Sequence, residues 1–386
     1  MSYIIHRAAL DNLYQNLDKF IEEYDSSRTL VMFGTNKIAG MILYYLRIHD
    51  IDVQAIIDND KQRQGKMFDG IPVYEPENYI KDKSKDVLVL IASAHQDAMI
   101  KQLEGFGCVY GENIKKIIDL PKLMNSYDFA EHTNCKLMTK EEIRESQIGI
   151  LKYLKKVCEE NGLRYFLCGG TLLGAVRHQG YIPWDDDVDV FVELNDLMKL
   201  HKILEHDKRY RLISMFDDSG YFDECSLLVD MDTVCDINRF PMQVTAGVSI
   251  DVFIVSGLPD GQEAIKVMDQ AKQLELACYN TLYSRKENKE AVKKLVAYMQ
   301  EYDFEQCPNV AHVLGRFMYR EITKKEYFEE SVLLPFEGEQ LACPKGWDAY
   351  LTDIYGEFMT LPPKEQQVAH HYFRAYWKEM FNKSTK

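Results

Sequence analysis

The sequence predicts a mixed α/β and α+β chain in two domains, residues 1–125 and residues 126–386. Short apolar segments alternate with helical patterns as far as about residue 120, which favours a parallel sheet in the first domain. The periodicity then lapses between residues 121 and 139, where the domain boundary is expected. Beyond this break, an apolar strand carries closely spaced aspartates. A chain of 386 residues is long enough to form two or three hydrophobic cores.

Composition and charge narrow the classes of function. A formal net charge of −15 argues against a nucleic-acid-binding protein, which needs a basic surface. The nine cysteines include no C-x-x-C pair, so we expect reduced core residues and neither a zinc site nor a redox pair. The first residues lack the apolar region of a secretory signal, and no segment approaches the ~18 apolar residues of a membrane span. We therefore expect a cytoplasmic location.

The N-terminal domain alternates helices with buried strands. Apolar residues have helical spacing over residues 7–24, and a glycine-containing turn leads into a second helix that ends near Ile48. The expected strands are the apolar segments 29–33, 53–58, 87–92 and, at the end of the domain, 114–120. This alternation indicates a small Rossmann-like module with a parallel, doubly wound sheet.

Gly34 and Gly40, followed by Asp58, are similar to a dinucleotide site, but their spacing is not G-x-G-x-x-G. This spacing therefore does not support a bound NAD. The turn at Gly34 is compatible with a phosphate at the start of the following helix. A structural or partner-docking turn is favoured, because a fold does not determine a ligand.

The second domain begins with a helix whose start and end are both marked. Thr139 and Glu142 have the spacing of a capping box, and Asn161-Gly162 is a typical helix stop. An apolar strand at residues 165–167 follows, and it leads into Gly169-Gly170.

Residues 169–178 have the pattern of an anion-binding turn. A glycine pair lets backbone approach a ligand closely, and a helix start presents N–H groups to an anion. We expect Gly169, Gly170 and Thr171 to contact phosphate groups of a substrate. Arg177 and His178 follow at the end of this short helical pattern. They are candidate cationic donors, and Arg177 is expected to bind the phosphates.

Aspartates on one face of a strand are the strongest signal in the chain. Asp187 and Asp189 project to one side of the strand, whereas Val188 and Val190 project to the other. Two such carboxylates repel each other unless a cation lies between them. A solvated acidic turn is the alternative, but the preceding glycine pair and the apolar strand favour a site for Mg²⁺, with Mn²⁺ as the alternative ion.

Asp251 is a lone charge within the apolar segment 248–255, where an unpaired carboxylate is costly. It is either an edge residue that faces water or a third acid in the same site, and the nearby aspartate strand favours the site. Because a carboxylate near the attacking oxygen can accept its proton, Asp251 is also the candidate general base.

The rest of the domain is predicted to be strands at 211–216 and 225–229, helices from Asn195 to about residue 206 and over 262–300, and a helical C-terminal extension. Nothing over 262–300 suggests chemistry. Trp347, Tyr350 and Ile354 have helical spacing, which is more typical of core packing than of a base-stacking surface.

Residues 169–177 (GGTLLGAVR) and 180–189 (GYIPWDDDVD) resemble the signature of the LicD family, and the resemblance extends over about residues 140–371. It implies a nucleotidyltransferase fold for the catalytic domain. It also implies that Asp187, Asp189 and the acid of the Ile-Asp-Val-Phe segment, Asp251, bind the metal, that Asp185 supports it, and that Trp184 contacts the substrate.

The family resemblance also implies an activity. Members of the LicD family transfer a phospho-alcohol, such as phosphocholine, ribitol phosphate or glycerol phosphate, from a CDP-linked donor to a sugar hydroxyl and release CMP. The acceptor implied is a glycan or glycolipid of a capsule, teichoic acid or lipopolysaccharide. Such glycans are made at the inner face of the membrane, so a peripheral association with that assembly is expected.

The C-terminal segments 344–351 and 355–363 resemble the second motif of the family, which ends at His370 and His371. Donor binding and lid packing are equally compatible with these histidines. Glutamines stand where the family often has a basic residue, so Lys364 is left as the candidate for a basic contact with the substrate.

Two other functions remain open. A nucleotidyltransferase that moves an NMP to a small acceptor would use the same metal site, and identification of the leaving group, CMP or pyrophosphate, separates it from phospho-alcohol transfer. A non-catalytic sugar-nucleotide-binding protein built around the N-terminal module is disfavoured by the intact set of carboxylates.

Overall fold

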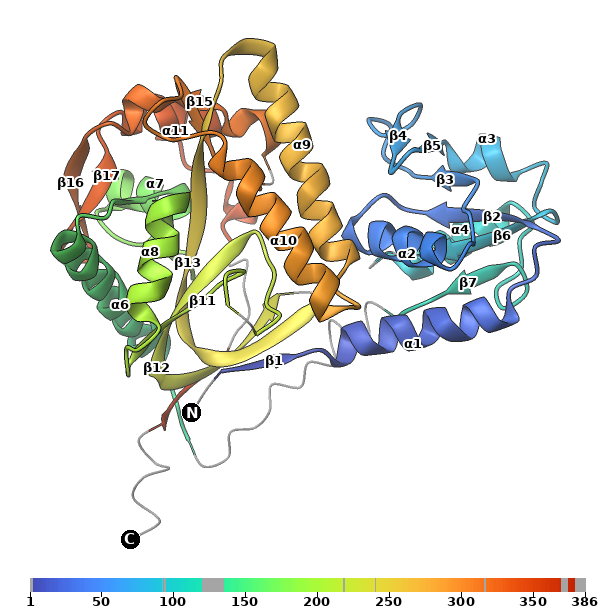
Figure 1. Cartoon of the computed structure of the whole chain (residues 1–386), viewed down its shortest axis with the longest axis horizontal. Helices are drawn as coiled ribbons and strands as arrows, with labels where there is room; N and C mark the ends of the chain where they lie inside the picture. Colours follow the sequence, from blue (N-terminus) through green and yellow to red (C-terminus); the bar gives the residue numbers. More distant parts are fainter. Residues whose placement is uncertain are drawn as a thin grey trace, which may run out of the picture. The chain divides into compact units, whose positions relative to one another are not determined.

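The computed structural model describes residues 3–91, 93, 95–119, 135–217, 219–239, 241–315, 317–368 and 374–378. The chain divides into two compact units that are not contiguous in sequence. Residues 7–130 form one unit together with residues 276–289, and residues 1–6, 131–275 and 290–386 form the other. Both units contain helices and sheets, so the mixed α/β character that the sequence predicts is confirmed (Figure 1).

The described part of the first unit forms a six-stranded sheet in the order β4-β5-β3-β2-β6-β7. All pairs are parallel except β4 with β5. The strands are β2 (Thr29–Phe33), β3 (Ala55–Ile57), β4 (Met67–Phe68), β5 (Ile71–Tyr74), β6 (Val87–Ile91) and β7 (Ile114–Lys116). The helices are α1 (Ala8–Glu23), α2 (Lys37–Ile48), α3 (Pro76–Ile80) and α4 (Gln96–Gly105). The predicted strands are therefore present, β2 with the predicted bounds and β3, β6 and β7 shorter, because apolar segments mark buried strands well.

The β4–β5 hairpin, like helices α3 and α4, was not assigned from the sequence. Its two-residue turn consists of Asp69, with φ +50°, and Gly70, with φ +79°. Positive φ at both turn positions is the geometry that Asp-Gly favours in a tight hairpin. The Asp-Gly dipeptide could therefore have predicted this hairpin from the sequence.

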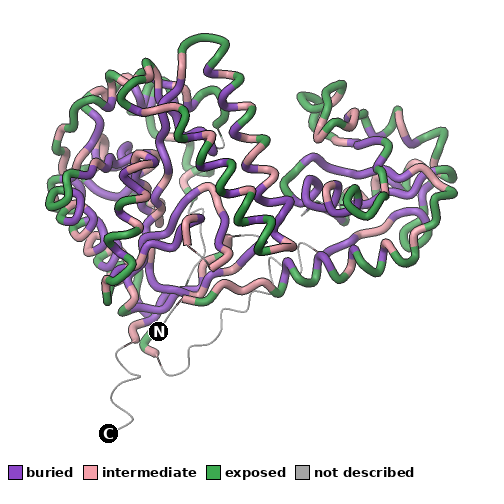
Figure 2. The backbone as a smooth tube through the Cα atoms, viewed as in Figure 1, coloured by how far each residue is buried: buried purple, intermediate pink, exposed green. Residues whose placement is uncertain are grey.

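The second unit is organised around a large sheet in which two very long strands are neighbours. It contains β1 (Ile4–His6), β9 (Tyr165–Leu167), β10 (Asp189–Glu193), β11 (Tyr210–Ile213), β12 (Cys225–Arg239) and β13 (Met242–Leu258). Strand β10 lies between β9, to which it is antiparallel, and β13, to which it is parallel. Figure 1 draws β12 and β13 as long, bent strands, and Figure 2 shows many buried positions along them. Both strands are longer than predicted, because their antiparallel pairing continues beyond the apolar segments at 225–229 and 248–255.

Two helices flank the strands that carry the aspartates. Helix α6 (Lys140–Asn161) begins with the predicted capping box between Thr139 and Glu142 and ends at Gly162, whose φ is +63°. Helix α7 (Gly169–His178) follows β9 directly. The start of α6 and its stop at Gly162 agree with the prediction, whereas α7 includes the glycine pair that was expected to form a turn before the helix.

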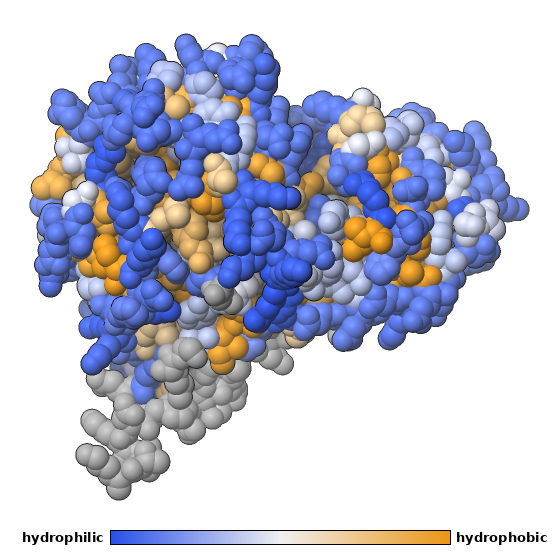
Figure 3. Space-filling model, viewed as in Figure 1, coloured by the Kyte–Doolittle hydropathy of each residue, from blue (hydrophilic) through white to orange (hydrophobic). Residues whose placement is uncertain are grey.

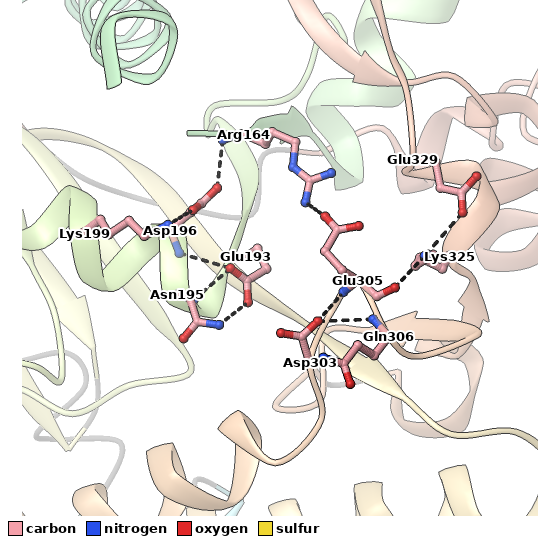
Figure 4. A network of polar contacts seen from close by, with 10 residues as sticks. All are labelled: Arg164, Glu193, Asn195, Asp196, Lys199, Asp303, Glu305, Gln306, Lys325 and Glu329. Carbon is pink, nitrogen blue, oxygen red and sulfur yellow. Dashed lines mark hydrogen bonds and ion pairs between the residues drawn. The ribbon is translucent and has the colours of Figure 1, made fainter. Parts of the chain in front are cut away.

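Helix α8 (Leu194–Leu204) begins earlier than predicted. The side chain of Glu193, the last residue of β10, accepts hydrogen bonds from the backbone N–H groups of Asn195 and Asp196. Glu193 therefore caps the helix in place of Asn195. A polar network surrounds this end of β10, and in it Arg164 pairs with Glu305 and its backbone N–H donates to Asp196 (Figure 4). The network fixes the end of β10 that is opposite Asp189.

The C-terminal region differs from the predicted helical extension. Helices α9 (Gly261–Asn280) and α10 (Arg285–Gln300) are followed by β14 (Asn309–Ala311), β15 (Thr323–Lys324), β16 (Ser331–Phe336), β17 (Glu339–Pro344), α11 (Trp347–Tyr355) and β18 (Ala375–Trp377). A two-residue turn, Glu337 and Gly338, both with positive φ, joins β16 to β17. Strand β18 pairs with β12 and so returns to the large sheet.

On the face shown in Figure 3, hydrophilic side chains cover most of the surface and hydrophobic ones form small separate patches. None of the described helices is both long enough and apolar enough to cross a bilayer.

Candidate active site

The register of two parallel strands places Asp189 beside Asp251. The two residues are partners in the β10–β13 ladder, and the N–H of Asp251 donates to the carbonyl of Val188 over 2.8 Å. Side chains of register partners project to the same face of a sheet, and adjacent strands are only ~4.8 Å apart. Both carboxylates line a cavity of about 590 Å³, together with Asp185 and Asp187.

The loop that precedes β10 brings the other acids close together. Carboxylate oxygens of Asp185, Asp186 and Asp187 all lie within 4.8 Å of one another. Helix α6 supports this loop, since Arg144 Nη2 donates to the carbonyl of Asp185 over 3.0 Å and Gln147 Nε2 donates to the carbonyl of Asp186 over 3.3 Å.

Gly169 and Gly170 make room for two of these carboxylates. A Cβ on Gly169 would lie 2.8 Å from Asp189 Oδ2, and a Cβ on Gly170 would lie 2.7 Å from Asp185 Oδ2. Gly169 also has φ +53°, a conformation that glycine adopts without strain. The sequence predicts that the glycine pair admits a ligand; in the structure both glycines line the cavity, and the groups packed against them are the aspartates.

Thr171 positions Asp189. Its side chain is buried, and its Oγ1 accepts a hydrogen bond of 2.8 Å from the N–H of Asp189. Thr171 is not among the residues that line the cavity, and its contact with a phosphate stays a prediction.

This hydrogen bond leads to a first prediction. Thr171→Val keeps the volume and removes the acceptor, so we expect a loss of about 1–3 kcal/mol in the free energy of unfolding, because the N–H of Asp189 loses its partner. Urea denaturation measures the loss. Thr171→Ser keeps the hydroxyl and is the matched control. Equal stability of the Val and Ser variants would contradict the role assigned to the hydroxyl.

The electrostatics of the cavity fit a divalent cation. Burial raises the pKa of the Asp189 carboxyl well above its ordinary value, and the neighbouring Asp187, Asp251 and Asp185 raise it further. Arg239 opposes this rise. Carboxylate oxygens are ligands that Mg²⁺ and Mn²⁺ accept, and an ion among these residues would relieve their repulsion. The donor set therefore suits the metal that the sequence predicts.

Most of the other predicted substrate contacts lie elsewhere. Arg177 Nη1 donates to the carbonyl of Phe358 over 2.7 Å, and His178 Nδ1 lies 3.5 Å from Arg177 Nε. Burial lowers the pKa of both groups, and Arg177 lowers that of His178 further. Lys364 is exposed in a short 3₁₀ turn. None of these three residues lines the cavity, whereas Trp184 does. His370 and His371 lie outside the described residues.

Several cavity residues were missed by the sequence interpretation. Phe191 and Phe253 follow Asp189 and Asp251 by two positions, so strand alternation could have predicted them. The others lie on distant segments. No motif marks Glu224, Arg239, His312, Phe317 or Glu321, whereas Tyr350 and Tyr355 belong to the segments that resemble the second motif of the family. Tyr350 and Ile354 are buried, as core packing predicts, and they also form part of the cavity wall.

Comparisons with known proteins identify the family of this chain. The family described as LicD/FKTN/FKRP, nucleotidyltransferase domain, matches residues 162–308, and the family described as C2185-like, N-terminal, matches residues 26–118. The chain is 30% identical over 269 residues to the lipopolysaccharide cholinephosphotransferase LicD of Haemophilus influenzae, an alignment that covers 62% of this chain and 99% of that relative. The chain belongs to the LicD family. It is therefore a transferase.

Shorter similarities to this LicD-family chain involve other proteins. The human ribitol 5-phosphate transferase FKRP is 52% identical over 46 residues, which is 12% of this chain and 9% of FKRP. The structure of UDP-D-quinovosamine 4-dehydrogenase from Vibrio fischeri covers 26% of this chain and 85% of that chain, with 22% identity and a TM-score of 0.22. A TM-score this low supports no conclusion about fold.

Proposed function

We propose that this LicD-family protein transfers a phospho-alcohol of the phosphocholine, ribitol-phosphate or glycerol-phosphate type from a CDP-linked donor to a hydroxyl of a cell-surface glycan or glycolipid, with release of CMP. The observation that carries the proposal is the register of β10 and β13, which puts Asp189 beside Asp251 in one cavity with Asp185 and Asp187. The similarity to a cholinephosphotransferase over nearly the whole length of that relative supports it.

The proposal gives each acid a role. Asp187, Asp189 and Asp251 would hold Mg²⁺ or Mn²⁺, and Asp185, packed over Gly170, would complete the site. The ion would neutralise the charge that develops on the donor phosphates. Thr171 and Gly169 fix the position of Asp189, and Trp184 offers a flat apolar surface at the cavity wall. Acceptance of the proton of the attacking hydroxyl by Asp251 stays a prediction.

The proposal extends to architecture and location. We assign a Rossmann-like fold to the unit that consists mainly of residues 7–130 and a nucleotidyltransferase fold to the unit that carries the aspartates. A cytoplasmic enzyme that acts at the inner face of the membrane would meet glycans during their assembly, and capsule, teichoic acid and lipopolysaccharide are the acceptor classes to test.

Transfer of a nucleotide is the second candidate, because the matching family is described as a nucleotidyltransferase domain. Both reactions would use the same carboxylates. They differ in the bond that breaks and therefore in the product that leaves. Phospho-alcohol transfer from a CDP-linked donor releases CMP, whereas nucleotide transfer from CTP releases pyrophosphate.

The test is incubation of the full chain with Mg²⁺ and CDP-choline, CDP-ribitol or CDP-glycerol, with and without candidate glycans. We expect CMP release from one of these donors that requires both Mg²⁺ and an acceptor. Pyrophosphate release from CTP, without CMP release from any CDP-alcohol, would favour the second candidate and contradict the first. EDTA is the control for metal dependence.

A further inference from the structure

Arg239 stands out among the residues of the cavity. It is the only lysine or arginine among the described residues that line the cavity. It ends β12, and its Nη2 forms an ion pair with Asp251 Oδ1. Its Nε lies 3.8 Å from Asp223 Oδ2, so the guanidinium spans two carboxylates. The Arg239 side chain is 19% exposed and that of Asp251 is 13% exposed, so the pair is largely shielded from water.

A donor diphosphate in this cavity would need a cationic partner besides the metal. Guanidinium groups bind phosphate oxygens through strong, charge-assisted hydrogen bonds. Arg177, which the sequence suggested for this role, donates to the carbonyl of Phe358, and Lys364 lies outside the cavity wall. Arg239 is therefore the basic side chain that the cavity itself offers to a phosphate.

The present partner of Arg239 is also a proposed metal ligand. A guanidinium that holds Asp251 Oδ1 competes with a divalent cation for the same oxygen, and two cations at one carboxylate repel each other. Asp223 offers a second anchor that does not depend on Asp251. The arginine can thus release one carboxylate and stay attached to the other.

We propose that Arg239 is a temporary counter-ion of Asp251. In the metal-free protein it neutralises the Asp251 carboxylate. Once a divalent ion binds Asp251, the guanidinium binds the donor diphosphate instead, and its ion pair with Asp223 holds it in place. This inference rests on the proposed function and adds the residue that clamps the donor. It predicts that the removal of the arginine affects metal binding and donor binding in opposite directions. If the ion pair were purely structural, removal of Arg239 would weaken both metal binding and donor binding or change neither.

The experiment measures two affinities of the full chain. Binding of Mn²⁺ alone is followed by electron paramagnetic resonance of the free ion, and binding of CDP at saturating Mn²⁺ is followed by calorimetry. We expect Arg239→Gln to bind Mn²⁺ several-fold more tightly, because a competing cation is gone, and to bind CDP about tenfold or more weakly, because a charge-assisted hydrogen bond is lost. Arg239→Lys keeps the positive charge but loses the planar guanidinium that can donate two parallel hydrogen bonds. We therefore expect its affinity for Mn²⁺ to be close to that of the wild type and its affinity for CDP to fall less than that of Arg239→Gln.

Arg209→Gln is the matched control. Arg209 pairs with the buried Asp230 over 2.9 Å on the same sheet, but it does not line the cavity. We expect it to leave both affinities unchanged even if stability falls. Loss of both affinities in Arg239→Gln, or no change in either, would overturn the inference while the proposed function stands. A wild-type chain that binds neither Mn²⁺ nor CDP would remove the proposed function and the inference with it.

Discussion

Asp189→Asn is expected to lower the rate of CMP release by roughly 10³-fold or more, because removal of a metal ligand should exceed the 10–100-fold typical of groups that only support ligands. Asn fills nearly the same volume, and the backbone N–H of residue 189 still donates to Thr171. The variant should therefore fold, and the loss should appear in kcat. Steady-state assays with the active CDP-alcohol at saturating Mg²⁺ measure it. A rate within a few-fold of the wild type would remove Asp189 from the mechanism.

The same variant should have the opposite effect on stability when no metal is bound. The pKa of Asp189 is raised by burial and then by the neighbouring carboxylates, so the folded chain holds this proton more tightly than the unfolded chain does. Its contribution to stability is therefore full below the ordinary carboxyl pKa of 3.8 and is lost as pH rises through the raised value. In EDTA, the melting temperature of Asp189→Asn should exceed that of the wild type near neutral pH.

Metal addition provides the control for this stability effect. Mg²⁺ should raise the melting temperature of the wild type more at pH 7 than at pH 5, because the carboxylate must be ionised to bind the ion. Asp189→Asn should respond much less at either pH. An equal response of both proteins to Mg²⁺ would show that the ion binds elsewhere.

Gly169→Ala should have the second largest effect on activity. The new methyl group would lie 2.8 Å from Asp189 Oδ2 and would displace the carboxylate, and a shift of about 1 Å at a reacting centre can cost roughly 10²-fold in rate. The positive φ of residue 169 adds strain of about 1 kcal/mol for any residue with a Cβ. The CMP-release assay and urea denaturation measure the two effects separately.

Gly162→Ala is the matched control for Gly169→Ala. Gly162 has a similar φ of +63°, but a Cβ there would meet nothing within 4 Å. It should lose a similar amount of stability and keep its activity. If both variants lose activity equally, strain and not displacement of Asp189 accounts for the loss.

The sequence was most informative about site residues that one short segment reveals by itself. Strand alternation singled out Asp187 and Asp189, and the cost of a lone charge in an apolar segment singled out Asp251. The structure corrects one of these positions, because only Asp189 lies in β10 and Asp187 lies in the loop before it. The strand register that joins Asp189 to Asp251 is a tertiary property, and the structure supplies it. Arg239 could not be found this way, because it lies at the far end of a hairpin and carries no motif.

Short hairpins and helix caps account for much of the remaining difference between the predicted and the observed secondary structure. The turns at Asp69-Gly70 and Glu337-Gly338 both have positive φ at two positions, whereas the strand predictions rest on apolar segments and not on turn residues. The C-terminal region was expected to be a helical extension, but the helical spacing of Trp347, Tyr350 and Ile354 applies only to α11 (Trp347–Tyr355). Glu193 replaces Asn195 as the cap of α8 because its longer side chain reaches back to two N–H groups.

Anomalous diffraction from crystals grown with Mn²⁺ is the most direct test of the carboxylate site. We expect a peak ~2.0–2.2 Å from carboxylate oxygens contributed by both β10 and β13, that is, by Asp189 and Asp251. A peak held only by the loop at Asp185–Asp187, or no peak in the cavity, would contradict the account.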